Sequence, residues 1–396
     1  MGSKDEVSYG SVVLAPLLLQ DDALRLTTTV EGARDGCMRF EKIMGSKALE
    51  VNTDKSVYLL SCKRKNLERI RAEIARTPLQ YKGSKIKEKS TEKWLGSIIN
   101  SAGTYESSIS TISDRKFRIY NIINETIAII EDCRFNKLGG LKCAKDIWEL
   151  AIIPSLLNNS ELFSIDNPKI QKLLEDFQST LYRGLLALPK SCPLPALTYE
   201  SNLLLMKYRV YSKLINFVKH VHCQSDETSL AKQILTEQLL NKWPGTSQQA
   251  ENICEDLNIS GLFNQDISKK QFKATVRKAC QLKNDEELKS QIQSYKKMSA
   301  LREEIKKGNC YFFSETIFRF RVELYESKLN FKNKPEFKAD NFLCDSCETE
   351  VDHHTHVLYC PAYSVLREDK NLNSDSDLAI YLQNVLDIRN KLRLNK

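Results

Sequence analysis

The chain opens with two apolar runs that are separated by a short acidic segment. The first run covers Val12 to Leu19 and the second covers Ala23 to Leu26, with Gln20, Asp21 and Asp22 between them. Apolar runs of this length, bounded by proline or by charge, are typical of buried strands. The pattern therefore predicts two strands joined by a tight turn that carries both carboxylates.

The adjacent carboxylates of Asp21 and Asp22 repel each other unless a cation neutralises them. Mg²⁺ suits such a pair, because it prefers hard oxygen ligands and is usually held by one or two carboxylates together with substrate phosphates. Aspartate is also a common turn residue, so an ordinary acidic turn is the simpler interpretation. The hairpin by itself leaves both alternatives open.

After this hairpin, the pattern predicts more helices and short strands. Thr28 and Glu31 have the spacing of a capping box, and residues 33, 37, 40 and 44 mark one apolar face of a helix. The next expected elements are a strand over 57–60, a lysine-rich helix over about 66–76 and a strand over 92–99. The predicted fold class is therefore α+β, with a small antiparallel sheet plus helices at the start of the chain.

The middle of the chain has the apolar spacing of helices. Helices are expected over 107–133, 146–157, 167–188, 199–222, 285–307 and 377–394. The first of these has an apolar stripe of residues 109, 112, 117, 120, 123 and 127, and its charge pattern favours a solvated basic face for Arg115, Lys116 and Arg118. The proline-rich segment 189–195 is typical of a rigid linker. Aromatic residues alternate with Arg319 and Arg321 over 312–325. Such a stretch can stack on a nucleic-acid strand, but buried aromatic residues more often form core, which is the interpretation we favour.

Cysteine and histidine gather near the carboxyl end. Cys344, Cys347, His356 and Cys360 form a C-x2-C-x8-H-x3-C pattern. Three thiolates and one imidazole make a tetrahedral ligand set for structural Zn²⁺, with no open position for catalysis. His353 or His354 can replace His356 in this pattern, and a chance gathering of free cysteines is the remaining alternative.

Composition limits the class of protein. The chain has 396 residues, 41% of them hydrophobic, and a formal net charge of +8, which suits a phosphate-bearing partner. No apolar run reaches the roughly 18 residues of a membrane span, and no secretory signal is evident. The twelve cysteines are therefore expected to be free thiols in a reducing compartment. We expect an intracellular protein of the cytoplasm and nucleus with no membrane partner.

Three short motifs follow one another in a familiar order. These are Gln20-Asp21-Asp22, then Asn52-Thr53-Asp54-Lys55-Ser56, then Trp94-Leu95-Gly96. They resemble motifs C, D and E of a reverse transcriptase palm of the non-LTR retrotransposon type, with Trp94 in place of a tyrosine. The segment from Cys344 to Pro361 is similar to the cysteine-rich tail that follows the polymerase in many of these elements.

The resemblance implies an RNA-directed DNA polymerase that performs Mg²⁺-dependent nucleotidyl transfer. Asp21 and Asp22 would hold Mg²⁺, because phosphoryl transfer uses metal ions to clamp the attacking and leaving oxygens. Lys55 would assist the departing pyrophosphate, and Trp94, Leu95 and Gly96 would form the primer grip. The implied partners are an RNA template and a DNA primer or target, with the zinc tail helping to bind template or target.

The resemblance also implies a division of the chain into four regions. They are the second half of the palm (1–105), a thumb-like helical region (106–189), a helical connector (196–335) and the zinc motif with a final helix (336–396). Motifs A and B, which supply a further catalytic aspartate and contact the incoming nucleotide, would belong to a polymerase segment before Asp21. The alternative is a non-catalytic, zinc-containing nucleic-acid-binding remnant that lacks motif A.

Overall fold

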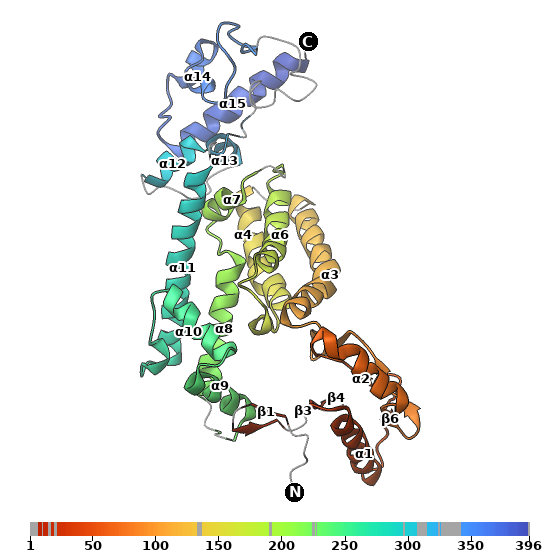
Figure 1. Ribbon diagram of the computed structural model, residues 1–396. Helices are drawn as coiled ribbons and strands as arrows, with labels where there is room; N and C mark the ends of the chain where they lie inside the picture. The colour runs from red at the N-terminus through yellow and green to blue at the C-terminus, as the bar shows by residue number, and fades with distance from the viewer. Residues whose placement is uncertain are drawn as a thin grey trace. The chain divides into compact units, whose positions relative to one another are not determined.

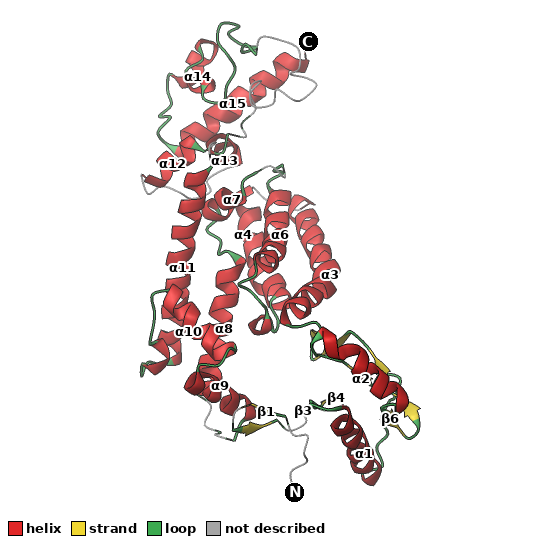
Figure 2. Ribbon diagram, in the orientation of Figure 1, coloured by secondary structure: helices red, strands yellow, loops and turns green. Residues whose placement is uncertain are grey.

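The structure is a computed structural model, and it is mainly helical with several short two-stranded sheets (Figures 1 and 2). It describes residues 7–9, 11–14, 17–19, 22–132, 137–189, 192–223, 226, 228–295, 298–306, 315–323, 325 and 342–394. Helices with small sheets are compatible with the predicted α+β class. None of the described helices is both long enough and apolar enough to cross a membrane.

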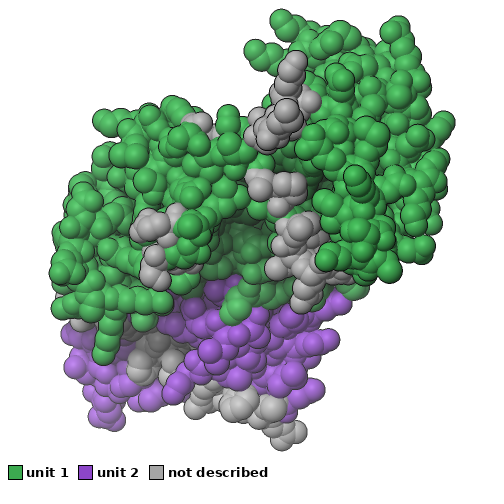
Figure 3. Space-filling view, turned by 90° about the horizontal axis from the view of Figure 1, so that it is seen from below, with its two compact units in different colours: residues 1–119, 154–174, 206–280 green, residues 120–153, 175–205, 281–396 purple. Residues whose placement is uncertain are grey.

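The chain divides into two compact units, each built from several segments of sequence (Figure 3). Unit 1 contains residues 1–119, 154–174 and 206–280, and unit 2 contains residues 120–153, 175–205 and 281–396. This division follows packing, and the four regions expected from sequence motifs remain predictions.

Unit 1 begins with two antiparallel hairpins. In the first, β1 (Ser8–Tyr9) pairs with β2 (Val12–Val13), and in the second β3 (Leu17–Leu19) pairs with β4 (Asp22–Leu24). The predicted pair of strands around the acidic segment is therefore present. Val13 is 50% exposed and Leu17 is 37% exposed, although the sequence pattern predicted buried strands. Each sheet has only two described strands.

The hairpins lead into α1 (Val30–Ser46), whose first turn is capped by Thr29. The Thr29 hydroxyl oxygen accepts a hydrogen bond from the Gly32 N–H at 2.9 Å. The predicted capping box would have placed the cap one residue earlier, at Thr28. The structure favours Thr29 because its oxygen reaches an otherwise unpaired N–H of the first turn.

The remainder of the first hundred residues forms α2 (Arg64–Arg76) and a series of short strands. These strands are β5 (Val57–Tyr58), β6 (Gln80–Tyr81), β7 (Ser84–Lys85), β8 (Lys87–Glu88), β9 (Thr91–Trp94) and β10 (Ser97–Asn100). β5 pairs with β8 in parallel, and β6 with β7 and β9 with β10 are antiparallel hairpins. The strand predicted over 92–99 is therefore a hairpin that turns at Leu95 and Gly96.

Helix α3 (Thr104–Asp132) buries a different set of side chains from the predicted apolar stripe. Ile112, Ile119 and Ile123 are buried, whereas Phe117 is 78% exposed. The buried stripe also includes Arg115, which is only 5% exposed. Residues 112, 115, 119 and 123 are three or four apart and so share one helix face, whereas Phe117 lies off that face.

The other helices complete the two units. They are α4 (Lys137–Ile147), the π-helix η1 (Trp148–Ile152), α5 (Ile153–Leu156), η2 (Ser160–Leu162), α6 (Pro168–Leu185), α7 (Leu194–Glu200), α8 (Met206–His222), α9 (Leu230–Asn241), α10 (Thr246–Asp256), η3 (Leu262–Asn264) and α11 (Lys269–Ser294). The predicted helix 199–222 is therefore two helices. The predicted linker ends in α7, which has Pro195 in its first turn, where a proline costs no hydrogen bond.

The carboxyl-terminal part of unit 2 packs around an aromatic core. It contains α12 (Ser299–Lys306), α13 (Glu315–Arg321), η5 (His356–Leu358), η6 (Pro361–Tyr363), α14 (Ser364–Arg367) and α15 (Asp375–Leu394). Phe318, Phe320 and Tyr325 are buried. Arg321 is also buried and is paired with Glu200 and Asp375. The described aromatic residues of this stretch are therefore part of the core, which confirms the interpretation that we favoured from the sequence.

Candidate functional site

The first half of the cysteine–histidine pattern is a short hairpin. Leu343 and Val351 form an antiparallel bridge, the Cys344 N–H donates to the Glu350 carbonyl at 2.8 Å, and the Asp352 N–H donates to the Phe342 carbonyl at 2.7 Å. Cys344 and Cys347 lie between these contacts. The hairpin therefore brings both thiols to the same turn of the chain.

The second half supplies His356 and Cys360 from consecutive short helical turns. His356 begins η5, and the Cys360 N–H donates to the His356 carbonyl at 2.8 Å. This bond confirms that one helical turn places the two side chains together, as their spacing predicted. Arg367 donates to the Cys360 carbonyl at 2.8 Å and so fixes the chain just after the last ligand.

The ligand atoms of Cys344, Cys347, His356 and Cys360 all lie within 4.8 Å of one another. The two sulfurs of Cys344 and Cys360 are 3.9 Å apart, and the Cys347 sulfur is 3.4 Å from His356 Nε2. Tetrahedral zinc with ordinary bond lengths requires about 3.8 Å between sulfurs and about 3.6 Å between sulfur and nitrogen. The donor set and its spacing therefore fit a metal such as zinc.

A carboxylate outside the cluster orients the histidine. Glu350 Oε2 lies 3.1 Å from His356 Nδ1 and can accept its proton, which leaves Nε2 with a free lone pair facing the sulfurs. Metal-binding histidines commonly have such a partner, because it fixes the tautomer and raises the basicity of the ligand nitrogen. The sequence pattern gave no sign of Glu350.

The thiols of the cluster differ in their acidity. Burial opposes ionisation of Cys347, but hydrogen bonds from the Thr349 side chain and from the backbone N–H groups of Thr349 and Glu350, together with its contact to His356, lower its pKa to about 6. Burial raises the pKa of Cys360 to about 12, against a hydrogen bond from the Ala362 N–H. The metal-free cluster therefore presents one ready thiolate beside a thiol that a bound cation would have to deprotonate.

The structure also distinguishes between the three neighbouring histidines. His353 Nδ1 is 2.7 Å from the Thr355 hydroxyl, and its Nε2 is 3.0 Å from the Tyr359 hydroxyl. The ring of His354 packs against Phe320, with centroids 5.8 Å apart. Neither histidine belongs to the cluster, so His356 is the ligand candidate.

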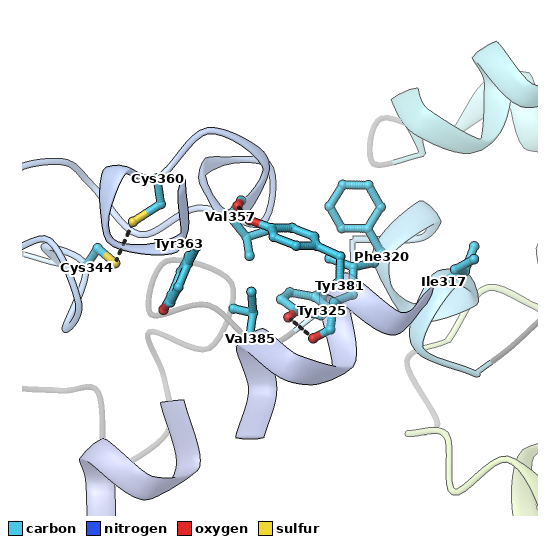
Figure 4. Close-up of a cluster of buried hydrophobic side chains, with 10 residues drawn as sticks. Ile317, Phe320, Tyr325, Cys344, Val357, Cys360, Tyr363, Tyr381 and Val385 are labelled. Carbon is cyan, nitrogen blue, oxygen red and sulfur yellow. Dashed lines mark hydrogen bonds between the residues drawn. The ribbon is translucent and has the colours of Figure 1, made fainter. Parts of the chain in front are cut away.

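The cluster is held against α15 by a buried polar network and an apolar core (Figure 4). Arg389 pairs with Asp352 at 2.7 Å and donates to the Tyr363 hydroxyl at 3.1 Å. Burial opposes the charge of Arg389, but the Asp352 carboxylate raises its pKa. Tyr363, Tyr381 and Val385 pack between the two buried cysteines and α13 in Figure 4.

The predicted primer-grip residues lie in a tight hairpin turn. Trp94 pairs with Ser97 at the ends of β9 and β10, leaving only Leu95 and Gly96 in the loop. Leu95 has φ of 47° and Gly96 has φ of 80°, the left-handed pair that a two-residue turn of this type requires. A leucine in this conformation is uncommon and needs support from neighbouring residues.

Arg115 and Asn159 give that support. Arg115 donates to the carbonyls of Gly96, Leu156 and Asn158 at 2.7, 2.8 and 2.7 Å. Asn159 donates to the Leu95 carbonyl and to the Ser97 hydroxyl, both at 2.9 Å. Burial lowers the pKa of Arg115, and the neighbouring charge of Arg118 lowers it further. The charge pattern favoured a solvated face for Arg115, but this side chain is buried and holds the turn.

An open hollow of about 490 Å³ lies beside this turn in unit 1. Its lining includes Lys93, Gly96, Asp114, Arg115 and Arg118. Lys93 is paired with Asp114 at 2.8 Å, and Arg118 donates to the Ser155 hydroxyl at 2.6 Å. Three cations against one carboxylate give the hollow a positive potential, which suits a phosphate.

The other predicted polymerase residues are placed only in part. The Asn52 side chain accepts from the N–H groups of Asp54 and Lys55 at 3.1 and 3.2 Å, which closes a turn that presents Lys55 to solvent. Asp22 is the first residue of β4 and pairs with Leu19. Asp21 and the side chain of Asp22 lie outside the described residues. The structure therefore leaves the magnesium site as a prediction.

Comparison with protein-family models, with curated proteins and with solved structures finds no match to this chain. The described fold and cluster define a helical protein with small hairpins and a Cys₃His group that could bind a metal such as zinc. Any closer assignment rests on the residues themselves.

Proposed function

We propose that this chain is the carboxyl-terminal portion of a reverse transcriptase of the non-LTR retrotransposon type, and that it positions the end of a primer on an RNA template. The observation that carries the proposal is the Trp94-Leu95-Gly96 turn. Arg115 of α3 fixes it beside a positively charged hollow. A rigid turn next to exposed cations is what the placement of a strand end requires, because positioning supplies most of the catalysis in phosphoryl transfer.

The proposed chemistry is nucleotidyl transfer assisted by Mg²⁺. Asp21 and Asp22 would hold the metal, which would polarise the reacting phosphate and clamp the attacking and leaving oxygens. Lys55, at the tip of the Asn52 turn, would neutralise the departing pyrophosphate. The third carboxylate of a two-metal site would come from a segment that precedes Asp21.

The zinc site has a structural role in this proposal. Zinc bound to Cys344, Cys347, His356 and Cys360 would link the hairpin to the η5 segment and keep the carboxyl-terminal region folded. Residues 342–394 contain nine Asp and Glu against five Lys and Arg. The region therefore has a negative net charge, and its contact with template or target would depend on particular side chains and not on an overall positive potential.

Primer extension tests the catalytic part of the proposal. The chain is incubated with a primed RNA template, nucleotides and Mg²⁺, beside an Asp21→Asn/Asp22→Asn variant. Asp256→Asn/Asp266→Asn is the matched control, because it removes the same charge from two exposed positions. Extension that is lost in the first variant and kept in the control supports a polymerase. Extension that survives in the first variant contradicts the proposed metal ligands.

The second candidate is a non-catalytic nucleic-acid-binding protein stapled by zinc. In such a protein the positive hollow would bind nucleic acid and the cluster would bind zinc, whereas Asp21 and Asp22 would have no role. Duplex binding that weakens with salt, without any extension, favours this candidate.

A further inference from the structure

The three cysteines of the metal cluster differ in their access to solvent. Cys344 is only 1% exposed and Cys360 is fully buried, and both belong to the core of the carboxyl-terminal region. Cys347 is partly exposed and packs only against the edge of that core. A small reagent in solution therefore reaches the sulfur of Cys347 before the other two sulfurs of the cluster.

The accessible sulfur of Cys347 lies against a buried one. The side chains of Cys347 and Cys360 share a hydrogen bond, and the Cys360 sulfur is also 3.9 Å from the Cys344 sulfur (Figure 4). Cys62 and Cys223 are exposed as well, but neither has a sulfur contact among the residues that the structure describes. An accessible cysteine beside a second cysteine that can resolve it is the arrangement of redox-sensing thiols.

Contacts that involve no metal hold the two sulfurs together. Asp352, at the end of the hairpin, pairs with Arg389 at 2.7 Å. Ser346, the residue before Cys347, shares a hydrogen bond of 2.5 Å with the Tyr363 hydroxyl. Both partners follow Cys360 in the chain. The loop that carries Cys347 is therefore tied to the segment after Cys360, and the two sulfurs remain neighbours when no metal joins them.

We propose that the cluster is a site of reversible oxidation by hydrogen peroxide, in which Cys347 is the sulfur that is oxidised and Cys360 is the sulfur that then forms a disulfide with it. The inference rests on the proposed metal site, because a bound cation keeps the cysteines as thiolates. It does not depend on the proposed polymerase function.

The reaction has two steps. In the first, the Cys347 thiolate attacks one oxygen of the peroxide, the O–O bond breaks, and a sulfenic acid and a hydroxide form. In the second, the Cys360 thiolate attacks the oxidised sulfur, the S–S bond forms, and the S–O bond breaks to release a second hydroxide. Two thiolates, one hydrogen peroxide and two protons from solvent thus give one disulfide and two water molecules.

The disulfide dismantles the ligand set. Only Cys344 and His356 remain, whereas a structural zinc site needs four protein ligands. The metal is therefore released in step with disulfide formation. A dithiol reductant restores both cysteines by thiol–disulfide exchange, and the hairpin contacts keep them in place for the metal to bind again.

The first test uses the unaltered full chain. Its zinc content is measured by elemental analysis, hydrogen peroxide is added, and the released zinc is followed with a chromogenic chelator. Remaining thiols are then alkylated, and disulfides are identified by mass spectrometry. We expect one zinc to be lost for each Cys347–Cys360 disulfide, and dithiothreitol with added zinc to reverse the loss. Zinc that stays bound while Cys62 is oxidised, or a disulfide that joins Cys344 to Cys347, would overturn the assignment.

The zinc content before oxidation separates this proposal from the metal site on which it rests. A chain that holds no zinc contradicts the metal site. The disulfide map still decides the redox proposal in that case, because Cys347 and Cys360 are in contact without a metal.

The second test replaces the accessible sulfur. Cys347→His keeps four ligands of the kinds that zinc accepts, so we expect it to bind zinc and to lose the release that peroxide causes. The control variant Cys62→Ser/Cys223→Ser removes two exposed sulfurs outside the cluster and should release zinc as fast as the unaltered chain. Release that persists in Cys347→His, or that is lost in the control, would contradict the proposal. If Cys347→His binds no zinc, the disulfide map of the unaltered chain decides.

Discussion

Arg115 donates a hydrogen bond to the carbonyl of Gly96, 2.7 Å away, and this contact joins helix α3 to the turn between β9 and β10. The same guanidinium also binds the carbonyls of Leu156 and Asn158. One buried side chain thus holds three segments that are far apart in sequence. The geometry of the proposed primer grip depends on it.

Replacing Arg115 with methionine should lower the free energy of unfolding by about 3 kcal/mol, because the buried carbonyl of Leu156 and the partly buried carbonyls of Gly96 and Asn158 lose a charged donor. Arg118→Met removes a neighbouring exposed arginine and should cost less than about 1 kcal/mol. Urea unfolding followed by circular dichroism measures both. Equal losses in the two variants would show that Arg115 is not specially placed.

The metal cluster predicts one zinc per chain. Cys344→Ser or Cys360→Ser should abolish the bound zinc and lower the midpoint of thermal unfolding, because the metal would link the hairpin to His356 of η5 and to Cys360. Cys62→Ser changes an exposed cysteine outside the cluster and should keep the full metal content. Elemental analysis of the purified variants decides the matter. Zinc retained by Cys360→Ser would remove this residue from the ligand set.

Glu350 is expected to tune the site rather than to bind the metal. Glu350→Gln should weaken zinc affinity by about 10- to 100-fold, because the carboxylate no longer orients His356 through Nδ1. Glu348→Gln changes a nearby exposed acid and serves as the control. Competition with a chelator gives both affinities. A loss shared by the two variants would indicate a general effect of charge.

The ion pair of Arg389 and Asp352 should be costly to break. Arg389→Leu leaves a carboxylate that is only 2% exposed without its cation, and the expected loss of stability is about 3–5 kcal/mol. The double variant Arg389→Leu/Asp352→Leu removes both charges and should recover part of this loss. Denaturant unfolding of the zinc-loaded chain measures the difference. A double variant less stable than the single one would contradict the argument.

The acidity of Cys347 gives a pH dependence for the metal-free chain. Its pKa is lowered from 9.0 to about 6 in the folded state, so folding is favoured most above the pKa of the unfolded thiol. This contribution is lost as the pH falls through about 6. Alkylation of Cys347 should therefore slow only below about pH 6 when the chain is folded. In the urea-unfolded chain it should slow below about pH 8.5. Identical profiles would contradict the shift.

Features set by local spacing could be predicted from the sequence. The strands on either side of Asp21, helix α2 and the three cysteines of the metal cluster each depend on residues close together in the chain. The choice of His356 over His353 and His354 could not be predicted. This choice depends on where η5 begins and on which histidine ring reaches Glu350, and the spacing of the ligands in the sequence indicates neither.

Contacts between a side chain and distant backbone atoms also could not be predicted from the sequence. Arg115 was expected on a solvated basic face, but it is buried because its acceptors are carbonyls of segments up to 43 residues away. A carbonyl is present in every residue, so no residue type marks such a partner. The predicted stripe of α3 included Phe117, which is exposed, and omitted Ile119, which is buried. Apolar character alone does not show which face of a helix is buried.

The most direct test of the account compares the binding of two nucleic acids by one chain. One is a DNA primer on an RNA template with a recessed 3′ end, and the other is the same hybrid duplex with its ends closed. We expect the chain to prefer the recessed end, and we expect Lys93→Gln/Arg118→Gln to remove this preference. Lys169→Gln/Lys172→Gln, which has the same change in charge, should keep it. Equal affinity of the unaltered chain for the two nucleic acids would contradict the proposed primer site.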